Sequence, residues 1–421
     1  MAAYVRRLHH VSLHVSNVDK LANDLISKFK FNLFATRRTE RTRQLVFRTG
    51  TAVFVVNERT NRGDSARLNG EPQPQPEPEP EPADAGCLYD IPPCYPVDTA
   101  CNVCFEVDDV RGSFEALRRL GCSFPVPPTT VGDPRGRVTY AVLRSVVGNV
   151  CHTLIDKSDY RGSFLPGFQV TEAEGGQAQA VTHVDHVDHI TYACPTGTSR
   201  EILRWYQQLF GFQRFFMHSN DKADSGLVIN QKGIGLRLTA MDYWKCGESG
   251  LSLPGCKFVL AESLPKQGSN QVNTFLKEHR AAGIQHIGLH TGNIVAAVRS
   301  MADAGVGFFS PPPAYYTQVG KLQEIEDAGQ DVQKLARHGI LLDADPQQQA
   351  SSASEAQRYL LQVFSKPIFA EDTFFLELIQ RKGASGFGEG NIQALWRSLQ
   401  TYMEGDKAEE GAPETGLQQS R

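Results

Sequence analysis

Three polar side chains stand in otherwise apolar segments along the second half of the chain. They are His189 in VDHITYA, His286 in AGIQHIGLH and Glu377 in FFLELIQR. Two neutral imidazoles and one carboxylate, each from a separate strand, are the set that holds Fe(II) on one face and leaves positions open for O2 and a chelating substrate. The sequence therefore predicts a mononuclear iron site at these three residues.

Each of these residues alone has a simpler interpretation. A strand histidine is more often a hydrogen-bonded polar residue than a ligand, and Glu377 could face solvent. Against solvent exposure, Glu377 stands within the apolar run 374–379, where an ionised carboxylate is costly unless a metal or a cation compensates it. Of the other histidines nearby, we interpret His183 and His186 as linker residues and expect His290 to lie outside the site.

The elements that must position these residues are repeated along the chain. A histidine-led strand, a polar turn, an amphipathic helix and a Phe-rich strand start occupy residues 9–34 and again 188–215. Two further pairs of segments match in the same way, 102–128 with 286–313 and 149–157 with 373–381. We expect four βαβββ units, two per half, and hence an α+β fold of two open barrels of mixed sheet.

Only the second half keeps all three ligands. The positions of the first half that match them hold His10, Asn102 and, approximately, Thr153. Asparagine and threonine are poor substitutes for an imidazole and a carboxylate, so the first half is expected to be a degenerate copy without iron.

Composition marks the boundaries of the two halves. The linker-like stretch EAEGGQAQA separates an N-terminal domain at 1–160 from a catalytic domain at 184–405, and a polar tail follows at 406–421. Residues 70–86 alternate proline with acidic residues, a pattern that favours an extended, unfolded insert on the surface.

The overall composition limits the partners. The 421 residues carry a formal net charge of -4 and are 40% hydrophobic, and no stretch of about 18 apolar residues occurs, which argues against a membrane span and a nucleic-acid surface. The nine cysteines are typical of free thiols in a reducing compartment. Cys101 and Cys104 form a CxxC, but residues three apart on a strand face opposite sides, so we interpret them as buried small hydrophobes.

The first ten residues, MAAYVRRLHH, are basic and resemble a mitochondrial presequence. We therefore expect a mitochondrial location, with the cytoplasm as the alternative. Residues 10–15 alternate like a core strand, so an import signal would have to be short or remain attached.

Four motifs together resemble a known family. VDHITYA, AGIQHIGLHTGNI, YLLQVFSKP and FFLELIQRKGASGFGEGN are similar, in order and spacing, to the iron-ligand motifs of the 4-hydroxyphenylpyruvate dioxygenase and hydroxymandelate synthase family of the vicinal oxygen chelate superfamily. The resemblance covers most of the chain and is most specific in the second half. It implies that the cofactor is Fe(II) and that the substrates are a small aromatic 2-oxo acid and O2. It also implies that the chain could form a homodimer.

The same resemblance implies a substrate pocket. Its polar part would be formed by Gln271, Gln285 and Gln362. Phe364 and Phe387 would hold an aromatic ring between them.

The resemblance also implies that a helix from Asn391 through Trp396 to Leu399 is the gate over this pocket.

Several positions depart from the dioxygenase pattern. Ile392 stands where the dioxygenase has Phe, and Ala261 and Leu238 replace a pocket Asn and Ser. In this family, loss of CO2 from the 2-oxo acid is coupled to activation of O2, and the substrate carbon held nearest to the iron is then oxidised. A smaller aliphatic residue at 392, similar to that of the synthases, favours attack on the side chain.

We therefore expect an enzyme that converts 4-hydroxyphenylpyruvate and O2 to 4-hydroxymandelate and CO2, a product that could feed ubiquinone headgroup synthesis. Three alternatives remain open. The chain could be a homogentisate-forming dioxygenase of tyrosine catabolism, or a non-catalytic relative that binds a keto acid. It could also be a zinc or nickel lyase of the glyoxalase type, although such enzymes usually draw ligands from both halves.

Overall fold

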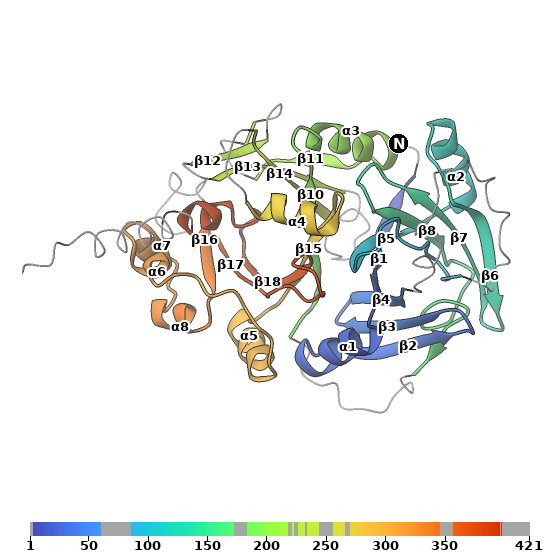
Figure 1. Ribbon diagram of the computed structural model, residues 1–421, viewed down its shortest axis with the longest axis horizontal. Helices are drawn as coiled ribbons and strands as arrows, with labels where there is room; N and C mark the ends of the chain where they lie inside the picture. The colour runs from blue at the N-terminus through green and yellow to red at the C-terminus, as the bar shows by residue number, and fades with distance from the viewer. Residues whose placement is uncertain are drawn as a thin grey trace, which may run out of the picture.

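The chain folds into two mixed sheets that lie side by side (Figure 1). In this computed structural model the described residues are 3–59, 86–171, 183–217, 221–222, 226–231, 234–243, 256–265, 270–345, 357–395 and 397. The predicted insert, apart from Gly86, and the predicted tail lie outside these residues.

The first half supplies one sheet, with its strands in the order β6-β7-β8-β5-β1-β4-β3-β2-β9. Because β9 pairs with β2, this sheet extends past residue 160. The elements in chain order are β1 (Val5–Val15), α1 (Val18–Asn23), the π-helical turn η1 (Asp24–Lys28), β2 (Asn32–Arg38), β3 (Arg43–Thr49), β4 (Ala52–Glu58), β5 (Thr99–Val107), α2 (Val110–Arg119), β6 (Val126–Asp133), β7 (Gly136–Arg144), β8 (Cys151–Asp156) and β9 (Gln169–Val170).

The second half supplies the other sheet, ordered β11-β13-β14-β10-β15-β18-β17-β16, with β12 paired on β13. Its elements are β10 (His186–Cys194), α3 (Ser199–Phe210), β11 (Gln213–Phe215), β12 (Leu227–Gln231), β13 (Ile234–Asp242), β14 (Lys257–Ser263), α4 (Gln271–His279), β15 (Gly283–His290), α5 (Ile294–Asp303), α6 (Ala314–Thr317), α7 (Lys321–Asp327), α8 (Val332–Arg337), β16 (Leu341–Ala344), β17 (Tyr359–Phe364) and β18 (Phe375–Lys382). A last helix covers 389–395. In the part of the chain that is described, no helix is long and apolar enough to cross a membrane.

Strand pairing confirms the predicted fold of four βαβββ units. In the first sheet β1 pairs antiparallel with β5 and parallel with β4, and β5 pairs parallel with β8. In the second sheet β10, β15, β14 and β18 repeat this arrangement strand for strand. The matched helices α2 and α5 are also capped alike, because Asp109 accepts the N–H of Gly112 and Asn293 accepts the N–H of Ala296.

Two β-bulges recur at matched places in the two sheets. The pairing of β1 with β5 changes register between Leu8 and His10, and the pairing of β10 with β15 changes register between Val187 and His189. Further along, both pairs shift register again, between Ser12 and Leu13 and between Thr191 and Tyr192, and the pairing of β1 with β5 has one more shift between Val5 and Arg7. A bulge inserts an extra residue and re-aims the side chains around it, so consecutive residues can meet on one face of the sheet.

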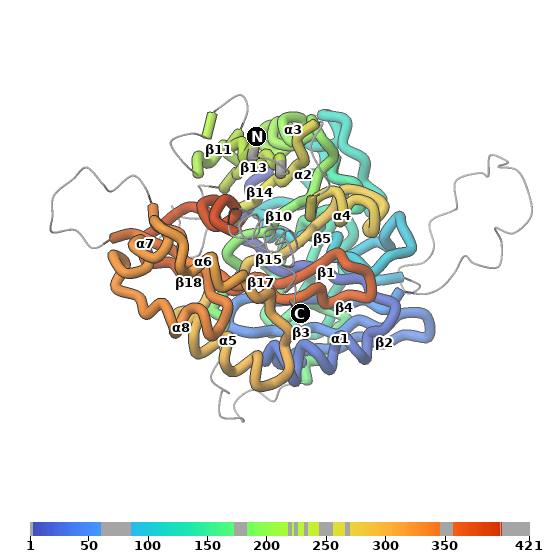
Figure 2. Tube along the Cα trace, turned by 60° about the vertical axis from the view of Figure 1, so that its left-hand side comes forward, coloured from blue at the N-terminus to red at the C-terminus, as the bar shows by residue number. Residues whose placement is uncertain are grey.

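A continuous apolar core joins the two halves. Phe105 of β5 packs beside Phe210 and Phe258 of the second half, with ring centroids 5.8 and 6.3 Å from its own. Figure 2 shows β1 and β5 next to β10 and β15 in the centre of the molecule. The strand that carries His189 is therefore backed by packed side chains from both halves, which keeps it rigid.

Candidate metal centre

The three predicted ligands meet on neighbouring strands of the second sheet, His189 on β10, His286 on β15 and Glu377 on β18. Glu377 Oε2 is 3.2 Å from His189 Nε2 and 3.5 Å from His286 Nε2. One candidate ligand atom from each residue lies within 4.8 Å of the other two. The imidazole rings are perpendicular, with centroids 5.6 Å apart. A single metal ion can therefore contact all three side chains.

The Glu377 carboxylate is incompletely satisfied, which fits a bound cation. The residue is 1% exposed, and its Oε1 atom has no hydrogen-bond partner among the described residues. A buried carboxylate with an unpaired oxygen is costly unless positive charge compensates it. The donor set, two imidazoles and one carboxylate, is that of mononuclear metal sites with open coordination positions.

Electrostatics distinguishes the two imidazoles. Burial disfavours the charged form of His189, but Glu377 and Asp188 outweigh burial and raise the pKa of His189 to about 9. Burial and then the charge on His189 hold the pKa of His286 well below its usual value. Without metal, His189 thus carries a second proton, on Nε2, and a cation that binds there would displace this proton.

A glycine makes room for one of the ligands. Gly288 on β15 pairs with His189 on β10 and with Glu377 on β18. A Cβ atom at Gly288 would lie 2.3 Å from His189 Cε1, which is closer than two carbon atoms can approach. Glycine at this position lets the His189 ring lie across β15 toward Glu377.

Two residues that the sequence patterns did not reveal orient His189. Asp188 Oδ1 accepts a hydrogen bond from His189 Nδ1 at 2.9 Å, across the bulge in β10. Arg381 donates two bonds of 2.7 Å to Asp188, and others to the carbonyls of Ala384 and Gly386. Burial opposes ionisation of Asp188, but Arg381 holds the pKa of Asp188 well below its usual range. The ionised Asp188 fixes the proton of His189 on Nδ1 and leaves Nε2 for the metal.

Aromatic side chains flank the ligands. Phe387 meets the His189 ring edge-on with centroids 5.0 Å apart, and Phe375 stacks on His286 at 4.8 Å. The Phe364 ring lies 6.4 Å from that of His286. The structure thus brings both predicted ring-binding residues, Phe364 and Phe387, beside the triad, one at each imidazole, and their contact with substrate stays a prediction.

The three predicted pocket glutamines lie in different surroundings. Gln285 is buried, with Oε1 3.3 Å from Nδ1 of His286. Gln362 is also buried, its Oε1 has no partner among the described residues, and a Cβ at Gly388 would lie 1.6 Å from that atom. Gln271 has an exposed side chain at the start of α4, so the structure does not join it to the triad, and its role stays a prediction.

The predicted gate is the helix that begins at residue 389 and is described through 395, whereas Trp396 and Leu399 lie outside the described residues. Asn391 is fully buried, and its Oδ1 accepts hydrogen bonds from Tyr315 Oη at 2.7 Å and Lys321 Nζ at 3.4 Å. Asn391 therefore ties the helix to α6 and α7. Ile392 packs against the apolar cluster of the second barrel.

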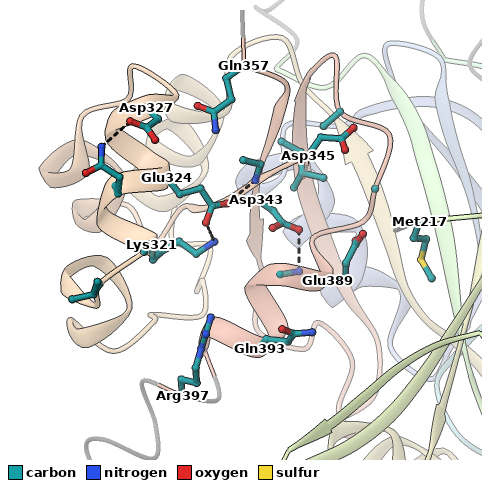
Figure 3. A pocket seen from close by; sticks show the side chains of 18 residues that line it. Met217, Lys321, Glu324, Asp327, Asp343, Asp345, Gln357, Glu389, Gln393 and Arg397 are labelled. Carbon is teal, nitrogen blue, oxygen red and sulfur yellow. Dashed lines mark hydrogen bonds and ion pairs between the residues drawn. The ribbon is translucent and has the colours of Figure 1, made fainter. Parts of the chain in front are cut away.

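An acidic cavity of about 650 Å³ lies against another face of this helix (Figure 3). Lys321, Glu324, Asp343 and Glu389 line it, and none of the three metal ligands does. Asp343 accepts the N–H of Gly390 at 3.0 Å, which holds the first turn of the helix. Burial and then the charge on Glu389 raise the pKa of Asp343 to about 7. We interpret this cavity as part of the support of the gate helix, separate from the metal centre.

The other histidines near the triad lie outside it. The interpretation of His186 as a linker residue was wrong, because β10 begins at this residue and its ring stacks on that of His290 with centroids 4.5 Å apart. His290 Nδ1 is 2.9 Å from Asp185 Oδ2, so this side chain points away from the metal ligands, as expected. His183 precedes the strand.

Known proteins are similar to this chain in sequence and in fold. Residues 185–330 match the family model of the Glyoxalase/Bleomycin resistance protein/Dioxygenase superfamily. The 4-hydroxyphenylpyruvate dioxygenase-like protein of Mus musculus is 43% identical over 405 residues, which cover 95% of this chain and 98% of that protein. The chain belongs to the 4-hydroxyphenylpyruvate dioxygenase-like family. The Homo sapiens protein of this family is 42% identical over 404 residues, with the same coverage.

Relatives outside the 4-hydroxyphenylpyruvate dioxygenase-like family are more distant. The 4-hydroxyphenylpyruvate dioxygenase of Yarrowia lipolytica is 29% identical over 406 residues, 94% of this chain and 91% of that protein. A mutant 4-hydroxymandelate synthase from Streptomyces coelicolor has the same fold, with a TM-score of 0.69 at 23% identity over 95% of this chain and 99% of that one. The triad described above thus lies in a fold shared with this synthase.

Proposed function

We propose that this chain is an Fe(II)-dependent dioxygenase that converts 4-hydroxyphenylpyruvate and O2 to 4-hydroxymandelate and CO2. The observation that carries the proposal is the cluster of His189, His286 and Glu377, in which the buried Glu377 carboxylate has an unsatisfied oxygen. The names of the relatives support an aromatic 2-oxo acid as substrate. The reaction balances, because one atom of O2 enters the new carboxylate and the other becomes the side-chain hydroxyl.

Bound Fe(II) would supply the activation of O2 coupled to loss of CO2 from the 2-oxo acid. The residues around it position the reactants. Asp188 and Gln285 contact the Nδ1 atoms of His189 and His286, which leaves both Nε2 atoms for the metal. The aromatic rings beside the imidazoles provide an apolar surface for the substrate ring and exclude water from it.

The choice of product depends on which substrate carbon is held nearest the oxidising centre. Leu238 and Ala261 belong to the apolar cluster of the second barrel, and Ile392 packs against this cluster. These three side chains cannot hydrogen-bond a ring hydroxyl, and Ile392 offers a smaller surface than the flat Phe that the resemblance sets at this position. We infer that the ring turns away and that its benzylic carbon is presented, which gives 4-hydroxymandelate.

Product chromatography after incubation of the iron-loaded protein with 4-hydroxyphenylpyruvate and O2 tests this proposal. We expect 4-hydroxymandelate as the main product, abolished by His286→Ala and retained by His290→Ala, a control on the same strand outside the triad. Homogentisate as the main product would refute the synthase assignment. A protein that binds iron and substrate but releases no product would instead be a binding protein.

The mitochondrial location remains a proposal that rests on the basic start of the chain. There the product would be available for synthesis of a quinone headgroup. Fractionation of cells that express the tagged protein tests this location, and recovery in the cytosol alone would refute it.

A further inference from the structure

A second cluster of metal-binding side chains lies in the first half, remote in sequence from the triad. His9, His10 and Cys104 each offer one ligand atom within 4.8 Å of the other two. The Nδ1 atoms of His9 and His10 are 2.8 Å apart. Cys104 is 0% exposed and His10 2%, whereas His9 is partly exposed. The prediction that Cys101 and Cys104 are free and buried is confirmed, but only Cys104 reaches this cluster.

The duplicated fold explains why these three residues meet. The bulge that precedes His189 in β10 recurs in β1, where it brings His9 against His10. Cys104 pairs with His10 in the first sheet as Gly288 pairs with His189 in the second. The first half has thus gained a side chain with a donor atom at the position of the glycine.

The positions that match the other two ligands of the triad hold hydrogen-bonded polar side chains instead. Asn102 donates to Asp90 Oδ1 at 2.7 Å and to Thr153 Oγ1 at 2.8 Å. His14 Nε2 lies 2.8 Å from Asp90 Oδ2. All four side chains are buried and hydrogen-bonded within this network, so none of them could become a ligand without breaking it.

The chemistry of the cluster differs from that of the triad. Two imidazoles and a thiolate form a soft donor set of the kind that Zn²⁺ and Co²⁺ bind in tetrahedral sites. Burial is the main cause that lowers the pKa of His10 to about 4 and that of His9 well below its usual value, so both rings are neutral near pH 7. The contact between the two Nδ1 atoms is a hydrogen bond, so one ring carries its proton on Nδ1 and must move it to Nε2 before both Nδ1 lone pairs can bind a metal. Burial raises the pKa of the Cys104 thiol, which would release its proton to solvent as it binds the metal.

A cavity of about 270 Å³ between the two halves gives access to the cluster. Its lining includes His9, His10, Phe164 and Lys157 from the first half and residues 186–190 of β10. Lys157 Nζ donates a hydrogen bond of 3.3 Å to the Phe164 carbonyl oxygen. This cavity is the route by which an ion and a water molecule would reach His9 and His10.

We propose that His9, His10 and Cys104 form a second metal site, which takes a zinc-type divalent ion and leaves one position open to the cavity between the halves.

Cobalt binding distinguishes this site from the triad. Thiolate ligands give Co²⁺ an intense near-ultraviolet charge-transfer band, and the triad contains no sulfur. Titration of the full-length protein with Co²⁺ should give two bound ions per chain and this thiolate band. Cys104→Ser should remove the band and one ion, whereas Cys101→Ser, a buried thiol on the same strand outside the cluster, should keep both.

Two further variants make the result decisive. His9→Gln changes a partly exposed side chain, so it decides the matter if Cys104→Ser does not fold, and it should also lose the thiolate band. Glu377→Gln should weaken Co²⁺ binding at the triad and keep the band. A wild-type protein that binds Co²⁺ without a thiolate band would overturn the proposal, as would a band that survives in both Cys104→Ser and His9→Gln.

Discussion

Replacing Asp188 with Asn tests whether an ionised neighbour of His189 sets the metal affinity. In the native protein the two carboxylate oxygens accept hydrogen bonds from His189 Nδ1 and from Arg381. An asparagine has one oxygen and one amide donor. If the amide donor faces Arg381, two N–H donors oppose each other and the guanidinium loses its anionic partner. If it faces His189, the ring must carry its proton on Nε2, which then cannot bind metal.

The magnitude follows from burial of this pair. Loss of a residue that orients a ligand typically weakens metal binding about 10- to 100-fold, which is roughly 1.4 to 2.7 kcal/mol. The Asp188 and Arg381 side chains are 6% and 13% exposed, so water screens their attraction weakly. Leaving a buried charge without its partner costs about 3 to 5 kcal/mol of unfolding free energy. Because asparagine keeps one acceptor, we expect a loss near 3 kcal/mol by that estimate.

Competition with a chromophoric chelator measures the metal affinity, and urea unfolding of the metal-free protein measures stability. Asp185→Asn is the matched control, because Asp185 also contacts a histidine at 2.9 Å but its side chain is 50% exposed. An exposed pair contributes less than about 1 kcal/mol. The reasoning is refuted if Asp188→Asn binds metal as tightly as the wild type, or if Asp185→Asn weakens binding equally.

Three other substitutions test the pocket and the gate helix. Gly388→Ala should lower activity and cost about 1 to 3 kcal/mol of unfolding free energy in urea, because its Cβ would lie 1.6 Å from Gln362 Oε1. The control Gly329→Ala is also at positive φ but has no neighbour within 4 Å, so it should cost about 1 kcal/mol. Equal costs for the two variants would contradict the clash. Asp343 has a pKa raised to about 7 in the folded protein, above its unfolded value of about 4, so Tm should fall as pH rises between these two values. Asp343→Asn should make Tm less dependent on pH in this range, and a variant with the wild-type dependence would contradict the assignment. Ile392→Phe should shift the product from 4-hydroxymandelate toward homogentisate in the chromatographic assay, and an unchanged product ratio would show that this residue does not orient the ring.

Repetition and polarity were sufficient to predict the duplicated fold and the residues of the triad. Polar residues in apolar strands are rare enough to be noticed, and the repeat places them on the central strands of one sheet. The first-half positions identified from the repeat, His10 and Thr153, are also the ones that strand pairing sets opposite Cys104, in the way His189 and Glu377 pair with Gly288.

The remaining features depend on geometry that strand alternation does not encode. Asp188 precedes His189 directly, and a regular strand would send their side chains to opposite faces, but a bulge brings them together. Asn391 was expected at the start of the gate helix, but no pattern indicated its partners there, Tyr315 and Lys321, which lie 76 and 70 positions earlier in the chain. Neither a local backbone irregularity nor a hydrogen bond between distant segments leaves a periodic trace in the sequence.

Equilibrium binding of Fe(II) under anaerobic conditions tests the central claim most directly. The His9→Gln background removes a donor of the first-half cluster, which leaves the triad as the one cluster of three such ligands among the described residues. We expect one Fe(II) per chain in this background, and loss of most of that iron when Glu377→Gln is added while far-ultraviolet circular dichroism stays unchanged. Iron bound with the same affinity in the presence of Glu377→Gln would contradict the account.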